Sequence, residues 1–109
     1  MTIRRILITG GSGLLALNWA CAMRQQCRVT LGVHRHDVKL VGVDTLQLRL
    51  DDEQEFSSQL RDLAPDLVVH TAGLTHVDQC EQNPMAARFA NAEIARTVAR
   101  CVDEQGIRL

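Results

Sequence analysis

Hydrophobic and polar positions along the chain alternate between two periods, one typical of strands and one typical of helices. Short runs of apolar and β-branched residues predict four strands, at residues 3–9, 28–33, 45–50 and 67–71. Apolar residues spaced three or four positions apart predict three helices, at residues 14–25, 52–63 and 83–105. Alternation of strands and helices is typical of a parallel sheet with right-handed crossovers. The pattern therefore predicts an α/β domain.

The last helix has the clearest ends. Asn83 can cap it, Pro84 suits its first position, and Gly106 can close it. Its apolar stripe consists of Ala87, Ala90, Asn91, Ile94, Val98, Cys101 and Val102. The apolar positions of the first helix are Leu14, Leu17 and Cys21 on one line and Leu15, Trp19 and Ala22 on another. The apolar residues after Gly106 fit the start of a fifth strand.

Composition narrows the classes of partner. The chain has 109 residues, 46% of them hydrophobic, which suits one domain with a single core. Its net charge is -1, and the interleaved charges form no basic face, which argues against nucleic acid as a partner. The apolar run before Gly10 is too short for a signal peptide or a membrane span, so no membrane partner and a cytoplasmic location are expected.

The chain has four cysteines, at positions 21, 27, 80 and 101, and no two of them have the spacing Cys-x-x-Cys. Thiols stay reduced in a chain without a secretion signal. All four are expected to be buried or half-buried thiols, and a disulfide framework or a zinc site is the alternative. No metal is expected.

A glycine cluster follows the first predicted strand, in the segment ILITGGSGLLA. Gly10, Gly13 and Ala16 occupy the small positions of Gly-x-x-Gly-x-x-Gly/Ala between a strand and a helix. The first allows a tight turn, the second lets the backbone approach a pyrophosphate, and the third lets helix and strand pack closely. Free N–H groups at the helix start attract phosphate oxygens. The residues expected to bind the cofactor here are Gly10, Ser12, Gly13, Leu14 and Leu15, and the alternative is a structural turn.

The end of the second predicted strand bears on the choice of cofactor. NAD-binding folds usually place a carboxylate there, whereas a basic residue accommodates the 2′-phosphate of NADP. The segment reads Gly-Val-His-Arg-His over residues 32–36, with no carboxylate before Asp37. Arg35, assisted by His34 or His36, therefore indicates NADP (NADPH), with NAD left open and a solvated loop as the alternative.

Three segments resemble a known family, the extended short-chain dehydrogenase/reductases, and most closely its dTDP-4-dehydrorhamnose reductase-like branch. They read TGGSGLLA at residues 9–16, APDLVVHTAGLTHVD at 64–78, and EQNP at 81–84 followed by NAE at 91–93. The resemblance covers nearly the whole chain. The middle segment is similar to the Ala-Ala-x-Thr-x-Val-Asp run of that branch, and it is more specific than the glycine motif.

The resemblance implies further site residues. Ala72, Gly73 and Leu74 would pass beneath the ribose and nicotinamide of the cofactor, and Thr75 would line the substrate pocket. Asn91 would reach the loops around the cofactor, although a purely structural hydrogen bond is an equal alternative.

The chain departs from the family pattern in two places. Where the family places an adenine-binding Asp, this chain reads Arg-Leu-Asp-Asp at 49–52, so Leu50 is expected to pack on the ring with Asp51 as the substitute carboxylate. The sequence contains no Tyr, so the family's Tyr-x-x-x-Lys proton donor is absent. The histidines do not replace it and are expected to be structural. No catalytic residue is assigned.

These observations predict a Rossmann-type three-layer α/β/α fold with a parallel sheet of order 3-2-1-4, incomplete at its C-terminal side. Residues 1–109 are expected to be the NAD(P)-binding domain and N-terminal half of a longer reductase acting on a 4-keto nucleotide sugar. A non-catalytic NADP-binding regulatory subunit stays open as the alternative because Tyr is absent. Homo-oligomers also stay open, because the fourth strand is expected to be an unpaired edge and the last helix poorly covered.

Overall fold

The computed structural model describes residues 3–10, 13–33, 39–71 and 84–109. Its strands are β1 (Arg5–Thr9), β2 (Arg28–Val33), β3 (Asp44–Gln47) and β4 (Leu67–His70). Its helices are α1 (Leu14–Met23), α2 (Glu53–Leu63) and α4 (Pro84–Glu104). Every strand and helix predicted from the sequence pattern up to residue 105 is present, with ends that differ by a few residues.

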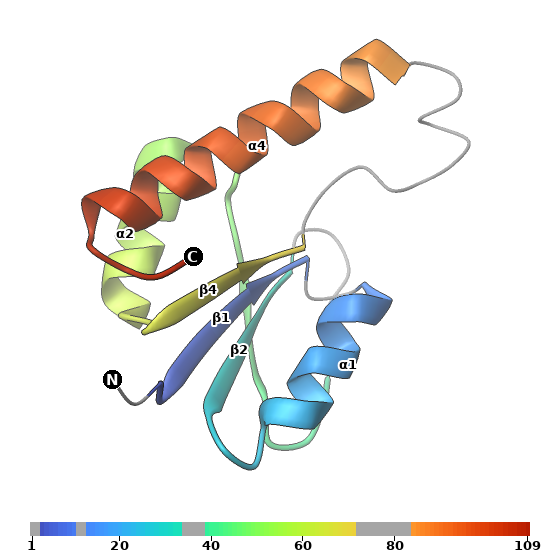
Figure 1. Ribbon diagram of the computed structural model, residues 1–109, viewed down its shortest axis with the longest axis vertical. Helices are drawn as coiled ribbons and strands as arrows, with labels where there is room; N and C mark the ends of the chain where they lie inside the picture. The colour runs from blue at the N-terminus through green and yellow to red at the C-terminus, as the bar shows by residue number, and fades with distance from the viewer. Residues whose placement is uncertain (1–2, 11–12, 34–38, 72–83) are drawn as a thin grey trace.

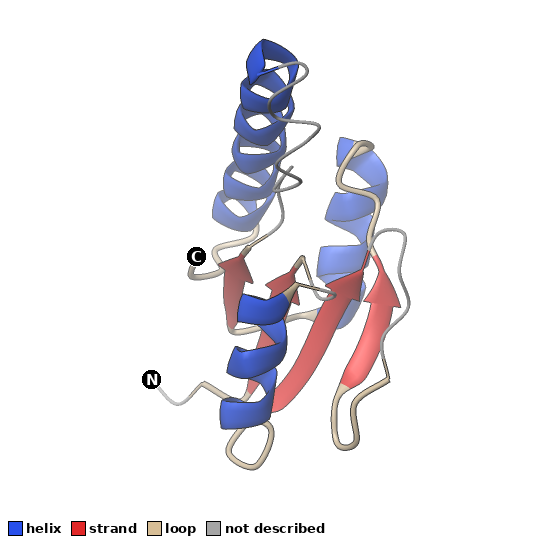
Figure 2. Cartoon of the chain, turned by 90° about the vertical axis from the view of Figure 1, so that its right-hand side faces the viewer, coloured by secondary structure: helices blue, strands red, loops and turns tan. Residues whose placement is uncertain are grey.

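The four strands form one parallel sheet in the order β3-β2-β1-β4, as predicted. Helix α1 covers one face, and α2 and α4 cover the other (Figures 1 and 2). In this register Thr9, the last residue of β1, lies opposite both Gly32 of β2 and His70 of β4. The carboxyl ends of β1, β2 and β4 therefore meet at one edge of the sheet.

Two apolar clusters hold the layers together, one on each face of the sheet. Side chains alternate along a strand, so neighbouring residues of β1 enter different clusters. The buried residues on the α1 face are Ile6, Ile8, Ala16, Ala20, Val29 and Leu31. Those on the other face are Leu7, Leu48, Phe56, Leu60, Val68, Val98, Cys101 and Val102.

Of the six apolar positions predicted for α1, only Leu17 packs against the core on the α1 face of the sheet. The helix buries Ala16 and Ala20, whereas Leu14, Leu15 and Trp19 are 78%, 60% and 42% exposed. Close packing of a helix on a sheet favours small side chains at the contact, so the alanines mark the inner face. The thiol at position 21 is also exposed, contrary to the expectation that every cysteine would be at least half-buried.

Helix α2 is fixed at both of its ends, and a carboxylate holds the connection that follows it. Asp52 caps α2 by accepting a hydrogen bond from the Glu55 N–H at 3.2 Å, and Ala64 ends it in the left-handed conformation, with φ of 49°. Asp66 Oδ2 then accepts hydrogen bonds from the N–H groups of Arg4 at 2.8 Å and Arg5 at 3.0 Å, which lower the pKa of this carboxyl. The start of β4 is thereby tied to the start of β1.

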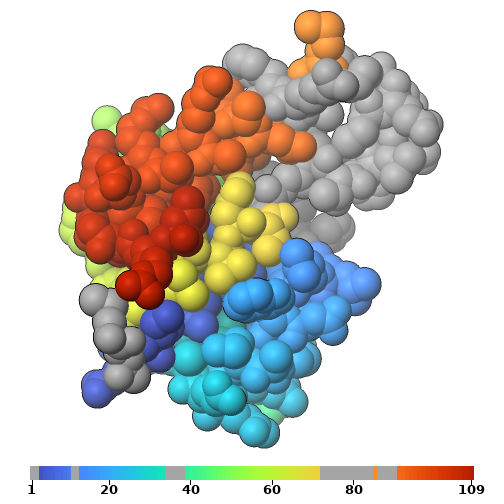
Figure 3. Space-filling view, viewed as in Figure 1, coloured from blue at the N-terminus to red at the C-terminus, as the bar shows by residue number. Residues whose placement is uncertain are grey.

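The outer edge of β4 has a partner at one point. Val68 N–H donates to the Arg108 carbonyl at 2.9 Å, in a parallel bridge between Leu67 and Arg108. The expectation of an unpaired edge is therefore wrong at this point. The last turns of α4 are also well covered, since Val98 and Val102 are buried. Part of β4 still reaches the surface between α1 and α4 (Figure 3).

Within the described residues, no helix is long and apolar enough to cross a membrane. The same part of the chain holds no group of three or more His, Cys, Asp or Glu residues suited to bind a metal ion. Cys21, Cys27 and Cys101 are free thiols. Cys80 lies outside the described residues.

Candidate functional site

The glycine turn connects the end of β1 directly to the start of α1. Gly10 has a φ of 69°, a conformation that favours glycine, and its carbonyl accepts a hydrogen bond from Gly13 N–H at 2.9 Å. Gly13 occupies the N-cap of α1, and its carbonyl accepts the first intrahelical bond, from Leu17 N–H at 3.0 Å. The turn thus aims the first N–H groups of α1 at the carboxyl edge of the sheet.

Small residues occupy the crowded positions of this turn. A Cβ on Gly13 would lie 3.2 Å from the Gly10 carbonyl oxygen, closer than ordinary van der Waals contact. Ala16 is fully buried against the sheet. Gly13 and Ala16 are therefore small for a steric reason, whereas Gly10 is a glycine because of its backbone conformation.

The start of α1 has the electrostatics of an anion site. No side chain caps the helix at Gly13, and its first turn contains no acidic residue. The N-terminal N–H groups and the positive end of the helix dipole are therefore available to a negatively charged ligand. Leu14 and Leu15 are exposed beside them. Ser12 lies outside the described residues.

The carboxyl ends of β1 and β4 are joined by side-chain hydrogen bonds. The fully buried Thr9 places its Oγ1 2.8 Å from His70 Nδ1, and Thr71 N–H donates to the same Oγ1 at 3.0 Å. The Thr71 hydroxyl in turn donates to the Thr9 carbonyl. Burial lowers the pKa of His70, so the ring is neutral at physiological pH. Sequence analysis assigned this histidine a structural role without finding its partners.

Leu50 and Asp51, the two residues expected near adenine, differ in burial and in their contacts. Leu50 is half-buried and packs against the cluster between the sheet and helices α2 and α4. Asp51 is exposed, and its Oδ1 accepts a hydrogen bond from Arg49 Nε at 3.2 Å, which raises the pKa of that guanidinium. Their contacts with adenine remain a prediction. Asn91 lies half-buried on α4, and its role at the cofactor also remains a prediction.

Several predicted residues cannot be placed. Those that lie outside the described residues are Ser12, His34, Arg35, His36, Ala72, Gly73, Leu74, Thr75 and His76. The glycine turn and the ends of β1, β2 and β4 are therefore the parts of the candidate site with known geometry.

Gly32, near the carboxyl end of β2, has a steric role that the sequence pattern did not predict. A Cβ at this position would lie 2.1 Å from Leu48 Cδ1 and 2.7 Å from Leu48 Cγ. Leu48 is only 2% exposed, because after β3 the chain turns this side chain into the core over Gly32. A glycine inside a strand is the signal that could have indicated the close approach.

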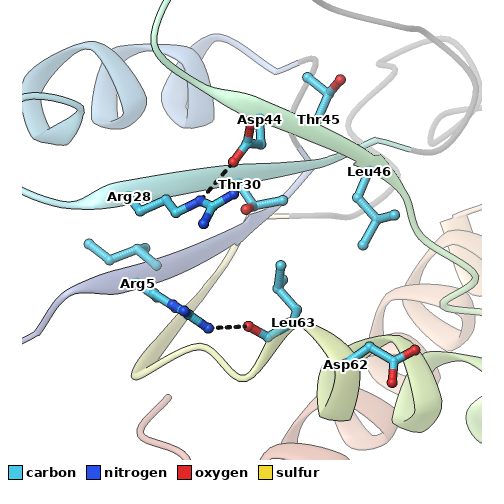
Figure 4. A pocket seen from close by; sticks show the side chains of 9 residues that line it. Arg5, Arg28, Thr30, Asp44, Thr45, Leu46, Asp62 and Leu63 are labelled. Carbon is cyan, nitrogen blue, oxygen red and sulfur yellow. Dashed lines mark hydrogen bonds and ion pairs between the residues drawn. The ribbon is translucent and has the colours of Figure 1, made fainter.

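A separate hollow of about 320 Å³ lies at the opposite, amino-terminal edge of the sheet (Figure 4). Arg28 Nε pairs with Asp44 Oδ2 at 3.0 Å, and Arg5 Nη1 donates to the Leu63 carbonyl at 3.5 Å. Arg28 and Asp44 of this hollow thus pair with each other, and Arg5 donates to a backbone carbonyl. Ligands of open α/β sheets bind at the carboxyl ends of the strands, which favours the glycine turn as the site.

The parallel sheet, its flanking helices and the glycine turn after β1 define a Rossmann-type fold. Residues 4–109 match the family described as the RmlD substrate binding domain, and the chain belongs to this family. This agrees with the resemblance to the dTDP-4-dehydrorhamnose reductase-like branch.

Two relatives illustrate the membership. A probable low-salt glycan biosynthesis reductase from Haloferax volcanii is 27% identical over 100 residues, which cover 92% of this chain and 33% of that protein. The dTDP-4-dehydrorhamnose reductase of Sinorhizobium fredii is 28% identical over 103 residues, covering 94% of this chain and 31% of that protein. The chain thus spans about a third of the length of these relatives.

Solved structures share the fold. A hypothetical dTDP-4-dehydrorhamnose reductase from Sulfolobus tokodaii has a TM-score of 0.80 at 25% identity, covering 94% of this chain and 36% of that one. WbmG of Bordetella bronchiseptica, crystallised with NAD and UDP, has a TM-score of 0.77 at 21% identity, covering 98% and 35%.

Proposed function

We propose that this chain is the cofactor-binding portion of a reductase that acts on a 4-keto nucleotide sugar with NADPH. The observation that carries the proposal is the glycine turn, which leads from β1 into the uncapped N-terminus of α1. The family membership and the reductases among the relatives support the class of substrate.

The residues at the turn fit a pyrophosphate. Gly10 gives the reversal, Gly13 keeps a Cβ out of the approach to the helix start, and α1 offers N–H donors there. When bound, the nicotinamide cofactor would supply the hydride. Gly10, Ser12, Gly13, Leu14 and Leu15 would hold the pyrophosphate.

The remaining cofactor contacts belong to the same proposal. Leu50 and Asp51 would flank adenine, and Arg35 would bind the 2′-phosphate. Asn91 and the residues after β4, Ala72, Gly73 and Leu74, would border the ribose and nicotinamide, with Thr75 facing the substrate.

A second candidate is a regulatory module that binds NADP without catalysis. The observation that favours it is the absence of Tyr from all 109 residues, since the proton donor of the family's Tyr-x-x-x-Lys segment is then missing from this chain. Without a positioned proton donor a factor of roughly 10²–10⁴ in rate is lost. Both candidates predict NADPH binding and no reductase turnover by the 109-residue chain, and turnover by a clean sample would contradict the assignment of catalysis to absent residues.

The choice of NADPH over NADH can be measured by calorimetric titration of both cofactors. The protein is expected to bind NADPH more tightly than NADH. Arg35→Ala is expected to reduce the difference between the two binding free energies by about 1 to 3 kcal/mol, because a charged contact to the 2′-phosphate is lost.

Arg28→Ala is the matched control. It removes an arginine at the start of β2, whose exposed pair with Asp44 lies at the edge of the sheet opposite the glycine turn, so the difference between the NADPH and NADH binding free energies should not change. Equal affinities of the unmodified protein for the two cofactors would refute the role of Arg35.

A further inference from the structure

Arg49 follows β3 at the carboxyl edge of the sheet, the same edge at which the glycine turn follows β1. β3 ends at Gln47, and the parallel register places this residue opposite Val33, the last residue of β2. Adjacent strands lie about 4.8 Å apart, so β3 is roughly 10 Å from β1. A nucleoside whose phosphate lies at the glycine turn can therefore cross the end of β2 and reach the residues after β3.

The backbone of Arg49 is held at both its N–H and its carbonyl group. The N–H donates to Gln59 Oε1 at 3.1 Å, and Gln59 Nε2 donates to the Gln47 carbonyl at 2.7 Å. The Arg49 carbonyl accepts from the Asp52 N–H at 3.1 Å, immediately before α2 begins. Because Gln59 belongs to α2, this helix fixes the point from which the Arg49 side chain extends.

The Arg49 side chain lies outside the core. Leu46 and Leu48 pack in the cluster between the sheet and helices α2 and α4, whereas the side chain of Arg49 is 53% exposed. Its Nε donates to Asp51 Oδ1 at 3.2 Å, and among the described residues no other side-chain hydrogen bond or ion pair holds the guanidinium. This bond occupies one edge of a planar group, so a flat face of the guanidinium is available to a ligand.

The surroundings of this guanidinium favour a neutral flat ligand over an anion. The Asp51 carboxylate, within hydrogen-bond distance, already balances the positive charge, so a second negative group gains less there. Arginine stacks its planar group on π systems, including the bases of nucleotides. In a dinucleotide whose pyrophosphate lies at the glycine turn, the adenine base is the flat group that reaches β3.

We infer that Arg49 is a cofactor-binding residue whose guanidinium stacks on the adenine base of the dinucleotide. This inference rests on the proposed function and adds one residue to it. Asp51 orients the guanidinium beside the base, and Gln59 is a positioning residue that acts through the Arg49 backbone.

Calorimetric titration of Arg49→Ala with NADPH and with NADH tests the inference. Both cofactors carry adenine, and only NADPH carries the 2′-phosphate. Loss of the stacked cation is therefore expected to weaken the binding of both cofactors to a similar extent, about three- to tenfold. Arg49→Lys keeps the charge without the planar group and should bind both cofactors nearly as weakly as Arg49→Ala.

Arg61→Ala is the matched control. Arg61 is an exposed arginine in the last turn of α2, close to the start of β4 and away from the glycine turn, so its loss should leave both affinities unchanged. Reduced nicotinamide mononucleotide, which lacks the adenosine, is the control ligand. Its affinity should be the same for Arg49→Ala and the unmodified protein, with folding of every variant verified by circular dichroism.

The outcomes separate the two claims. If the unmodified protein binds both cofactors and folded Arg49→Ala binds them equally well, Arg49 has no role at the base, although the proposed function stands. A loss confined to NADPH would place Arg49 at the 2′-phosphate, and full affinity in Arg49→Lys would show that charge alone suffices; either result overturns the inference. If the unmodified protein binds neither NADPH nor NADH, both claims fail.

Discussion

At the scale of single residues, the two glycines where an added Cβ would meet the closest atoms are Gly13, at the N-cap of α1, and Gly32, inside β2. Gly13 faces a backbone oxygen, whereas Gly32 faces a buried side chain. The first was predictable, because the motif and its place between strand and helix define it. The second depends on where Leu48 packs, which the local sequence does not specify. Contacts between distant segments are the part of the site that sequence reasoning could not supply.

Gly32→Ala is expected to destabilise the protein by about 1 to 3 kcal/mol, the range for overpacking a core. The added Cβ overlaps Leu48, which is buried and cannot move without repacking its neighbours. Urea unfolding measures the free energy of unfolding of the variant and the unmodified protein.

The control is the same substitution in a Leu48→Ala background, where the obstructing atoms are gone. There Gly32→Ala should have little effect or stabilise the strand, and the difference gives the coupling between the two positions. If Gly32→Ala lowered the free energy of unfolding by the same amount with Leu48 present and with Leu48→Ala, the steric explanation would be contradicted.

At the scale of elements, the order of strands and helices followed from periodicity, but the orientation of α1 did not. Its apolar residues surround most of the helix, so the spacing of the large ones did not identify the inner face, which is made of alanines. Helix α2 was easier because its apolar residues, Phe56, Leu60 and Leu63, all pack against the core and the rest of the helix is polar. β3 ends at Gln47, earlier in the chain than predicted. The Leu48 N–H still donates to the Val33 carbonyl at 2.8 Å, and the Leu48 side chain packs in the core.

The end of α2 provides a test at this scale. Ala64 holds a left-handed conformation that is costly for a residue with a Cβ, whereas glycine adopts it freely. Ala64→Gly is therefore expected to stabilise the protein by about 0.5 to 1 kcal/mol, after allowance for the greater freedom of glycine in the unfolded chain.

Ala22→Gly is the counterpart at an exposed position inside α1, where glycine is unfavourable. It should destabilise the protein by about 1 kcal/mol, so the two alanine-to-glycine changes have opposite signs in thermal or urea unfolding. A loss of stability for Ala64→Gly would mean that the left-handed turn carries no strain.

At the scale of the whole molecule, the sheet brings the candidate site together from segments far apart in sequence. β1 supplies the glycine turn, and β4 supplies the partners of Thr9 from more than sixty residues away. The central claim is that the turn at this edge binds the pyrophosphate of a nicotinamide dinucleotide.

Calorimetric titration with NADPH of the unmodified protein, Gly13→Val and Ala22→Val tests that claim most directly. Gly13→Val fills the approach to the start of α1 and crowds the Gly10 oxygen, while Ala22→Val places the same side chain at an exposed position of the same helix. With folding verified by circular dichroism, the account predicts at least about a tenfold loss of affinity, some 1.4 kcal/mol, for Gly13→Val alone. Unchanged affinity in a folded Gly13→Val protein would contradict the dinucleotide assignment.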